Sequence, residues 1–310
     1  MHLHHIRRQT PMPLLKAINR AAQLLFLPAG KAILHGHPGL LRRQADIMGN
    51  TVVSGIEREY GEIAGLKVAW FNPPHRRDDT IIVSAHGGGF VVGSCDAHAG
   101  IASRLAAATR RPVLVYNYRR APEHPYPAAV DDGLRVYSAL LAMGYPAGRI
   151  VLTGDSAGGT LVLAQLIALR DRGLPLPCAA IINCPWIDFE LQSPTLRAAG
   201  DPFLNYASML AYADAAMPDA ALRRQYSLSH ADYHGLPPIH LLIAGKDPLH
   251  TDALGLLEKL RAAGNAGHAE LWDDMPHVWQ GLAPLLVEAA QAAENVAGFI
   301  DRCVAGSAGV

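Results

Sequence analysis

Short runs of β-branched and other apolar residues alternate with longer alanine- and leucine-rich segments from about residue 65 to the end of the chain. This alternation is typical of strands joined by crossover helices, and it predicts a mostly parallel central sheet flanked by helices, the α/β fold class. Several runs are apolar throughout, as expected for strands buried on both faces. We expect strands at residues 80–84, 113–116, 150–153, 180–183, 239–243 and 269–272.

The longer segments between these runs predict the helices. We expect helices at residues 97–109, 127–143, 157–172, 252–263 and 285–303. Gly144, Gly173 and Gly264 follow three of these segments, where a residue that tolerates positive φ commonly ends a helix.

Two regions lack the alternation and divide the chain. Residues 1–50 are interpreted as helical without a strand, and residues 188–235 are rich in Pro, Asp, Ala and Tyr. Inserts at the carboxyl ends of strands tend to cover the active site of an α/β protein, so we interpret both regions as a cap. The predicted division is N-terminal cap helices at 1–50, the first part of an α/β core at 51–187, a cap insert at 188–235 and the second part of the core at 236–310.

The pentapeptide Gly154-Asp155-Ser156-Ala157-Gly158 follows a predicted strand and opens a predicted helix. A G-x-S-x-G sequence in that setting is typical of a nucleophile elbow, in which a sharp turn projects the serine hydroxyl above the sheet. Glycine is needed on both sides because a Cβ there would collide with the neighbouring strand or helix. Ser156 is therefore the predicted nucleophile.

A glycine run at residues 86–90 follows an earlier strand. Its sequence is His86-Gly87-Gly88-Gly89-Phe90. Fixing three consecutive glycines in a folded chain costs much conformational entropy, so a functional reason is expected. Acyl transfer supplies one, because the tetrahedral intermediate carries an oxyanion that needs backbone N–H donors. We expect an oxyanion hole built from Gly87, Gly88, Gly89 and Ala157, with the last three as donors. His86 is interpreted as a residue that fixes this loop.

A serine hydroxyl needs a histidine base, and that histidine needs a carboxylate to hold its tautomer. On this fold the chain order is Ser, then Asp or Glu, then His. Asp247 follows the strand at 239–243 and His277 follows the last strand, so these two are the predicted acid and base. The competing candidates for these roles are His250, His268, Asp252 and Asp274.

These motifs together resemble the hormone-sensitive-lipase-like branch of the α/β-hydrolases, the bacterial family IV esterases, in its GDSAGG subgroup. The resemblance rests on residues 86–89, 118–129, 154–159, 247–249 and His277. It implies an esterase of the α/β-hydrolase fold that uses no metal or organic cofactor, carries a helical cap over an apolar pocket, and is often a dimer. Trp279 stands where this family usually has Phe, which is expected to reshape the pocket.

Composition limits the partners and the cellular compartment that we expect for the chain. Lys and Arg together number 27, and so do Asp and Glu, so the chain lacks the basic excess that nucleic acid requires. No apolar run approaches the roughly 20 residues that span a bilayer. The apolar stretch at 21–29 is interpreted as an amphipathic helix and the four cysteines as reduced, which favours the cytoplasm. The early His2, His4 and His5 are expected in a frayed terminus rather than at a metal.

The sequence thus predicts a serine carboxylesterase that hydrolyses short- to medium-chain esters through an acyl-enzyme intermediate. A lactonase, a deacetylase and an amidase or formamidase would use the same triad, and these alternatives stay open. A non-catalytic receptor on this fold is disfavoured because all three catalytic residues are present. The expected partners are a small ester substrate and a second copy of the chain in a homodimer. Candidate pocket residues are Phe90, Trp186, Phe203, Tyr206 and Trp279.

Overall fold

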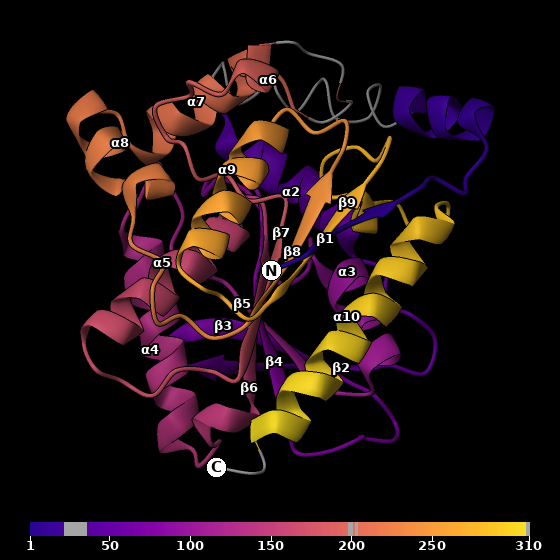
Figure 1. Cartoon of the computed structure of the whole chain (residues 1–310), viewed down its shortest axis with the longest axis vertical. Helices are drawn as coiled ribbons and strands as arrows, with labels where there is room; N and C mark the ends of the chain where they lie inside the picture. The colour runs from indigo at the N-terminus through magenta and orange to yellow at the C-terminus, as the bar shows by residue number, and fades with distance from the viewer. Residues whose placement is uncertain (22–35, 198–200, 202–203, 308–310) are drawn as a thin grey trace.

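The computed structural model describes residues 1–21, 36–197, 201 and 204–307. Its centre is a nine-stranded sheet in the order β1-β9-β8-β7-β6-β4-β5-β3-β2 (Figure 1). β2 and β3 form an antiparallel hairpin, β3 is antiparallel to β5, and every other neighbouring pair in the sheet is parallel. The strands are β1 (Leu3–Ile6), β2 (Glu57–Ile63), β3 (Leu66–Asn72), β4 (Ile81–Ala85), β5 (Val113–Tyr116), β6 (Ile150–Asp155), β7 (Ala179–Asn183), β8 (Ile239–Ala244) and β9 (His268–Trp272).

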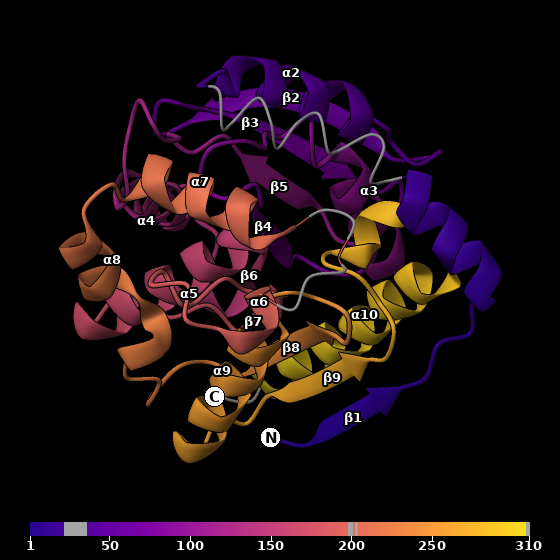
Figure 2. The same ribbon diagram turned by 90° about the horizontal axis from the view of Figure 1, so that it is seen from above.

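Helices cover both faces of this sheet (Figures 1 and 2). Alternate residues of β4 show why, since Ile81 and Val83 pack into the core beneath one helical layer and Ile82 packs into the core beneath the other. A strand that is apolar on both faces needs such double cover. One layer contains α4 (Ala128–Ala142), α5 (Ala157–Asp171) and α9 (His250–Ala262), and the other contains α3 (Ala99–Thr109) and α10 (Val287–Ser307).

The six predicted strands and five predicted helices of the core are confirmed, with ends that differ by a few residues. The hairpin of β2 and β3 was not predicted. β2 is exposed along most of its length, so it lacks the apolar alternation that identifies a half-buried strand. Three short 3-10 helices complete the core and its connections, at Ala147–Arg149, Leu228–His230 and Trp279–Leu282.

The interpretation of residues 1–50 as helical without a strand is wrong at its start. Leu3–Ile6 forms β1, which pairs in parallel with β9 and adds an edge strand to the sheet. The same pairing contradicts the expectation of a frayed terminus. The region is helical as predicted over residues 12–21 and in α2 (Pro38–Gly49), and most of the apolar stretch at 21–29 lies outside the described residues.

The described residues between 188 and 235 form helices and no strand, as expected. These helices are α6 (Pro194–Arg197), α7 (Tyr206–Ala216) and α8 (Ala220–Tyr226). Figure 1 shows α6 and α7 above the end of the sheet to which β8 and β9 point, and the helix at residues 12–21 lies at the same end. Helical cover therefore lies over the carboxyl ends of the parallel strands. Among the described helices, none is both long and apolar enough to cross a membrane.

Candidate active site

Ser156 occupies the sharp turn between β6 and α5. Its backbone has φ 53° and ψ −123°, a conformation that residues with a side chain rarely adopt, and it precedes the first residue of α5. The flanking glycines allow this turn. A Cβ on Gly154 would lie 2.3 Å from the carbonyl oxygen of Gly158, and a Cβ on Gly158 would lie 2.0 Å from that of Ala85. The predicted nucleophile-elbow geometry is present.

Asp247 and His277 come together from the loops after β8 and β9. His277 Nδ1 lies 2.8 Å from Asp247 Oδ2, and both side chains are buried. The other carboxylate oxygen of Asp247 accepts a hydrogen bond from the Leu249 N–H at 2.8 Å, which fixes the carboxylate. Because the carboxylate can only accept, Nδ1 carries the proton and Nε2 is left as the basic nitrogen.

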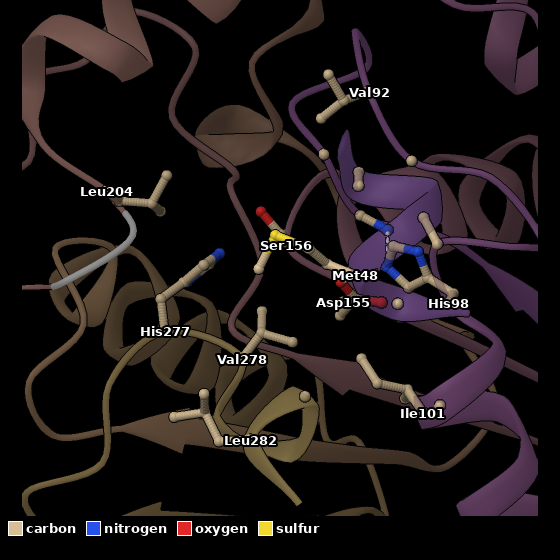
Figure 3. A pocket seen from close by; sticks show the side chains of 18 of the residues that line it. Met48, Val92, His98, Ile101, Asp155, Ser156, Leu204, His277, Val278 and Leu282 are labelled. Atoms are coloured by element: carbon tan, nitrogen blue, oxygen red, sulfur yellow. Dashed lines mark hydrogen bonds and ion pairs between the residues drawn. The ribbon is translucent and has the colours of Figure 1, made fainter. Parts of the chain in front are cut away.

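His277 and Ser156 line the same cavity. In Figure 3 the imidazole ring of His277 points toward Ser156, with Val278 and Leu282 beside it. The structure thus places the predicted base and nucleophile on one cavity, and the predicted acid is in direct contact with the base.

The competing candidates for acid and base make other contacts. His250 Nδ1 lies 3.0 Å from the Ala244 carbonyl oxygen, and His268 lies on β9 near Glu270. Asp252 accepts from a backbone N–H on another loop, and Asp274 accepts from Arg8 at 3.2 Å. The described structure therefore offers Asp247, among the predicted carboxylates, as the partner of His277.

Asp201 is a second carboxylate at this histidine, and the sequence did not reveal it. Its Oδ2 accepts the backbone N–H of His277 at 2.7 Å, and its Oδ1 accepts that of Leu204 at 3.0 Å. Asp201 is buried, and it connects the insert at 188–235 to the loop that carries the base. The available sequence signal was an acidic residue in the mostly apolar stretch Ala198–Leu204, which has no recognised motif.

The charges around His277 set its proton affinity. Burial alone would lower the pKa of the imidazole, but the charge and hydrogen bond of Asp247, followed by the charges of Asp201 and Asp155, raise the pKa above its ordinary value. An imidazole surrounded in this way holds a proton more readily. This is the property that a base needs when it must carry the serine proton through an intermediate.

The glycine loop lies against the same cavity. Gly88 and Gly89 have φ of 111° and 60°, and a Cβ on Gly89 would lie 2.4 Å from the ring of Tyr212 on α7. Ala157 is the first residue of α5, so its N–H has no acceptor within the helix. The N–H of Gly87 donates to His98 Nε2 at 3.1 Å, so it is engaged within the loop, whereas Gly88, Gly89 and Ala157 are the three predicted donors.

Buried contacts hold this loop from behind. His86 is fully buried, its Nδ1 lies 2.9 Å from the Gly87 carbonyl oxygen, and burial lowers its pKa well below the ordinary value. Its ring stacks on Tyr118 with 4.0 Å between ring centroids, and the Tyr118 hydroxyl donates to the His86 carbonyl at 2.9 Å. A buried neutral imidazole in these contacts supports the loop, as the sequence suggested.

Arg42 on α2 ties the loop to its neighbours. Its guanidinium donates to the carbonyl oxygens of Val91 at 2.8 Å and Ala121 at 2.7 Å, and it holds Glu123 in a bidentate ion pair. That pairing lowers the pKa of Glu123 to about 2. One side chain therefore connects α2 with the segment that follows the glycines.

The cavity has a volume of about 620 Å³ and a largely apolar lining. Trp186 lines it as predicted, together with cap residues and residues of the first 50. Met48, Val92, Ile101, Leu204 and Leu282 surround Ser156 in Figure 3. A cavity of this size accommodates a small-molecule ligand with apolar groups.

Three other predicted wall residues do not line this cavity. Phe90 is buried against Trp186, with ring centroids 6.0 Å apart, and Trp279 is buried against Trp272, with centroids 5.4 Å apart. Tyr206 lies under the guanidinium of Arg197, 4.1 Å from it. These three aromatic rings pack in the core or lie at the surface. Proximity to a motif in the sequence was therefore a wrong basis for predicting that they line the cavity. Phe203 lies outside the described residues.

Comparison with known proteins agrees with this geometry. Residues 82–281 match the family described by the alpha/beta hydrolase fold. An acetyl-hydrolase of Streptomyces hygroscopicus is 39% identical over 230 residues, covering 73% of this chain and 77% of that protein. Carboxylesterase NlhH of Mycobacterium tuberculosis is 32% identical over 247 residues, covering 75% and 77%.

Solved structures extend the similarity over the whole fold. An esterase from the bacterial hormone-sensitive lipase family superposes with a TM-score of 0.85 at 35% identity, covering 96% of this chain and all of that one. The chain belongs to the α/β-hydrolase family. Within it, the resemblance to the hormone-sensitive-lipase-like esterases is confirmed.

Proposed function

We propose that this chain hydrolyses short- to medium-chain carboxylic esters, with Ser156 as nucleophile, His277 as base and Asp247 as the residue that orients the base. The observation that carries the proposal is the buried 2.8 Å contact between His277 Nδ1 and Asp247, with the imidazole turned toward Ser156. Ester hydrolysis agrees with the relatives, which are described as esterases, carboxylesterases and an acetyl-hydrolase.

The reaction follows from the positions of these groups. Ser156 Oγ attacks the ester carbonyl carbon while His277 Nε2 takes the hydroxyl proton, and the resulting oxyanion accepts hydrogen bonds from Gly88, Gly89 and Ala157. The same proton passes to the departing alcohol as the carbon–oxygen bond breaks, leaving an acyl-enzyme. Water then attacks the acyl carbon with His277 again as base, and the acid and free Ser156 are released.

The substrate class rests on the cavity. Its apolar lining and volume of about 620 Å³ fit an uncharged ester with short or medium apolar groups. The relative from Streptomyces hygroscopicus is named an acetyl-hydrolase, which supports the proposal that the accepted acyl groups include small ones such as acetyl. We also propose that residues 1–50 and 188–235 form a cap over a core that consists of residues 51–187 and 236–310.

Substitution of the nucleophile tests the reaction. Ser156→Ala should lower kcat on a short-chain chromogenic ester by about 10⁶-fold, because removing one member of a triad abolishes its joint action. Ser54→Ala, which removes an exposed hydroxyl outside the cavity lining, is the matched control for hydroxyl loss and should leave turnover within about tenfold of the original. Turnover of Ser156→Ala equal to that of the control would remove Ser156 from the mechanism.

A substrate panel separates ester hydrolysis from the alternatives. The kcat/KM values for acetate, butyrate and octanoate esters of one alcohol, a lactone and an anilide should be highest among the esters. A lactone or anilide that exceeds every ester would reassign the chain to a lactonase or an amidase using the same residues.

A cytoplasmic location and a homodimer are further proposals. The buried thiols of Cys95, Cys178 and Cys184 agree with a reducing compartment, and cell fractionation tests it. The exposed apolar side chains of Leu40 and Ile47 on α2 support an interface between copies, which light scattering on a purified sample tests by mass.

A further inference from the structure

A cluster of ligand-type side chains lies at the end of the sheet opposite to the catalytic loops. His240 lies near the start of β8, and His268 and Glu270 lie on the first half of β9. The register pairs His240 with His268, so these side chains project from the same face of adjacent strands. That face is covered by α10, whose Phe299 packs 5.0 Å from the His240 ring centroid.

The distances within the cluster match the spacing of ligands around a shared ion. Glu270 Oε1 lies 3.4 Å from His240 Nε2 and 3.6 Å from His268 Nε2, and the three atoms all lie within 4.8 Å of one another. A charge-assisted N–H···O hydrogen bond would be about 2.7 to 2.9 Å long. Ligands bound tetrahedrally to zinc at about 2.0 to 2.2 Å are instead roughly 3.3 to 3.6 Å apart.

His240 gives a second, independent observation. Its side chain is completely buried, and neither of its ring nitrogens has a hydrogen-bond partner among the described residues. Leaving a buried polar group without a partner costs about 1 to 3 kcal/mol, so such groups normally have an explanation. A cation bound at Nε2 would supply a partner for that nitrogen.

We propose that His240, His268 and Glu270 bind a divalent transition metal, with zinc as the ion tested. Two imidazoles and one carboxylate suit zinc in charge and ligand type, and they leave one tetrahedral position for water or a further ligand. His4 on β1 is a candidate for that position, since its ring centroid lies 4.6 Å from that of His268. The metal would join three adjacent strands, β1, β8 and β9, far from the serine.

Neighbouring groups are arranged as outer partners of such a site. Trp272 Nε1 donates to Glu270 Oε2 at 3.0 Å, and Asn295 on α10 donates to Oε1 at 3.0 Å, which leaves a lone pair of Oε1 for the ion. Outer hydrogen bonds of this kind orient metal ligands. The side chain of His268 is 26% exposed, so an ion can reach the cluster from solvent.

Zinc titration of the untagged, EDTA-treated and dialysed chain by isothermal calorimetry tests the proposal. The unmodified chain should bind one zinc at this site and show a higher melting temperature with zinc, because a ligand that binds the folded state stabilises it. His268→Gln should weaken binding at least tenfold, since even loss of an outer partner of a metal costs 10- to 100-fold. His234→Gln, an exposed histidine elsewhere, is the matched control and should bind as the unmodified chain does.

The second cluster that could hold an ion is formed by Cys184, Asp247 and His277, and it must be separated from this one. His277→Asn should keep the zinc, and cobalt bound to the unmodified chain should show no thiolate charge-transfer absorption, since the proposed ligands contain no sulfur. A chain that takes up no zinc, equal affinity in His268→Gln, or a thiolate band with loss of binding in His277→Asn would each overturn the proposal. None of these readouts depends on esterase activity.

Discussion

At the scale of single residues, the base His277 is held on two sides. Asp247 contacts its ring and Asp201 contacts its backbone N–H, and both charges raise the pKa of the imidazole. Asp247 belongs to a loop of the sheet, whereas Asp201 belongs to the insert. The segment 188–235 therefore contributes directly to the electrostatics of the proposed base.

We expect Asp201→Asn to move the acid limb of the kcat/KM profile to lower pH. The base acts only when neutral, and removing a nearby negative charge makes the protonated imidazole less stable, so a neutral base persists at lower pH. Asparagine keeps one oxygen that accepts the His277 N–H, and it gives up the second acceptor, which Asp201 offers to the Leu204 N–H. The measurement is kcat/KM for one ester between pH 5 and 9.

Asp214→Asn is the matched control, because Asp214 lies in the same insert and its side chain is 61% exposed. Its profile should coincide with that of the unmodified chain. An unmoved acid limb in Asp201→Asn, or an equal movement in both variants, would limit Asp201 to a structural role.

Residues in sequence motifs were predictable, and those without motifs were not. The positions of Ser156, Asp247 and His277 were predictable because backbone conformation and chain order constrain them on this fold. Asp201 has no such constraint, since its role depends on a contact 76 residues away in sequence. Trp279 was expected in the pocket because it closely follows His277 in sequence. The backbone instead turns at Val278, which has a φ of 48°. As a result Val278 lines the cavity and the Trp279 indole is buried in the core.

At the scale of elements, α2 supports the oxyanion loop through Arg42. We expect Arg42→Ala to lower kcat by about 10- to 100-fold with little change in KM, because losing the contacts to Val91 and Ala121 would displace donors that act mainly on the transition state. Steady-state kinetics on a short-chain ester measures both constants.

Arg43→Ala is the control, because Arg43 is the next residue of α2 and is exposed. It should retain the original kcat. If both variants kept full turnover, the contacts of Arg42 would have no part in holding the loop.

Strands and helices were predictable where burial imposes a pattern. β4, β5 and β7 are mostly apolar because helices cover both faces, and that apolarity is visible in the sequence. β1 is four residues long at the edge of the sheet, and its two central residues, His4 and His5, are histidines, so it carries no apolar pattern. Its position is set by backbone pairing with β9, which a sequence pattern does not encode.

At the scale of the whole molecule, the insert is joined to the core by a buried carboxylate with an unusual proton affinity. Asp252 in the first turn of α9 accepts the backbone N–H of Asp188 at 3.1 Å, where the chain leaves the core for the insert. Burial, opposed in part by this hydrogen bond, raises the pKa of Asp252 from 3.8 to about 7. The folded chain thus prefers the protonated carboxyl.

This shift makes the stability of the fold depend on pH. A carboxyl whose pKa is higher in the folded than in the unfolded state contributes stability that is complete below pH 3.8 and is lost as pH rises toward and through 7. Asp252→Asn keeps a hydrogen-bond acceptor without the charge, so it does not suffer this loss. Its advantage in unfolding free energy over the unmodified chain should grow by about 2 to 3 kcal/mol between pH 5 and pH 8.

Urea denaturation of both chains at pH 5, 6, 7 and 8 measures this difference. Asp79→Asn serves as the control, because Asp79 is exposed and its replacement removes a charge without changing a buried contact. The difference for the control should stay constant over this range. If the difference in unfolding free energy between Asp252→Asn and the unmodified chain were equally independent of pH, Asp252 would already be charged in the folded chain at pH 5. The contact between α9 and the start of the insert would then tolerate a buried carboxylate.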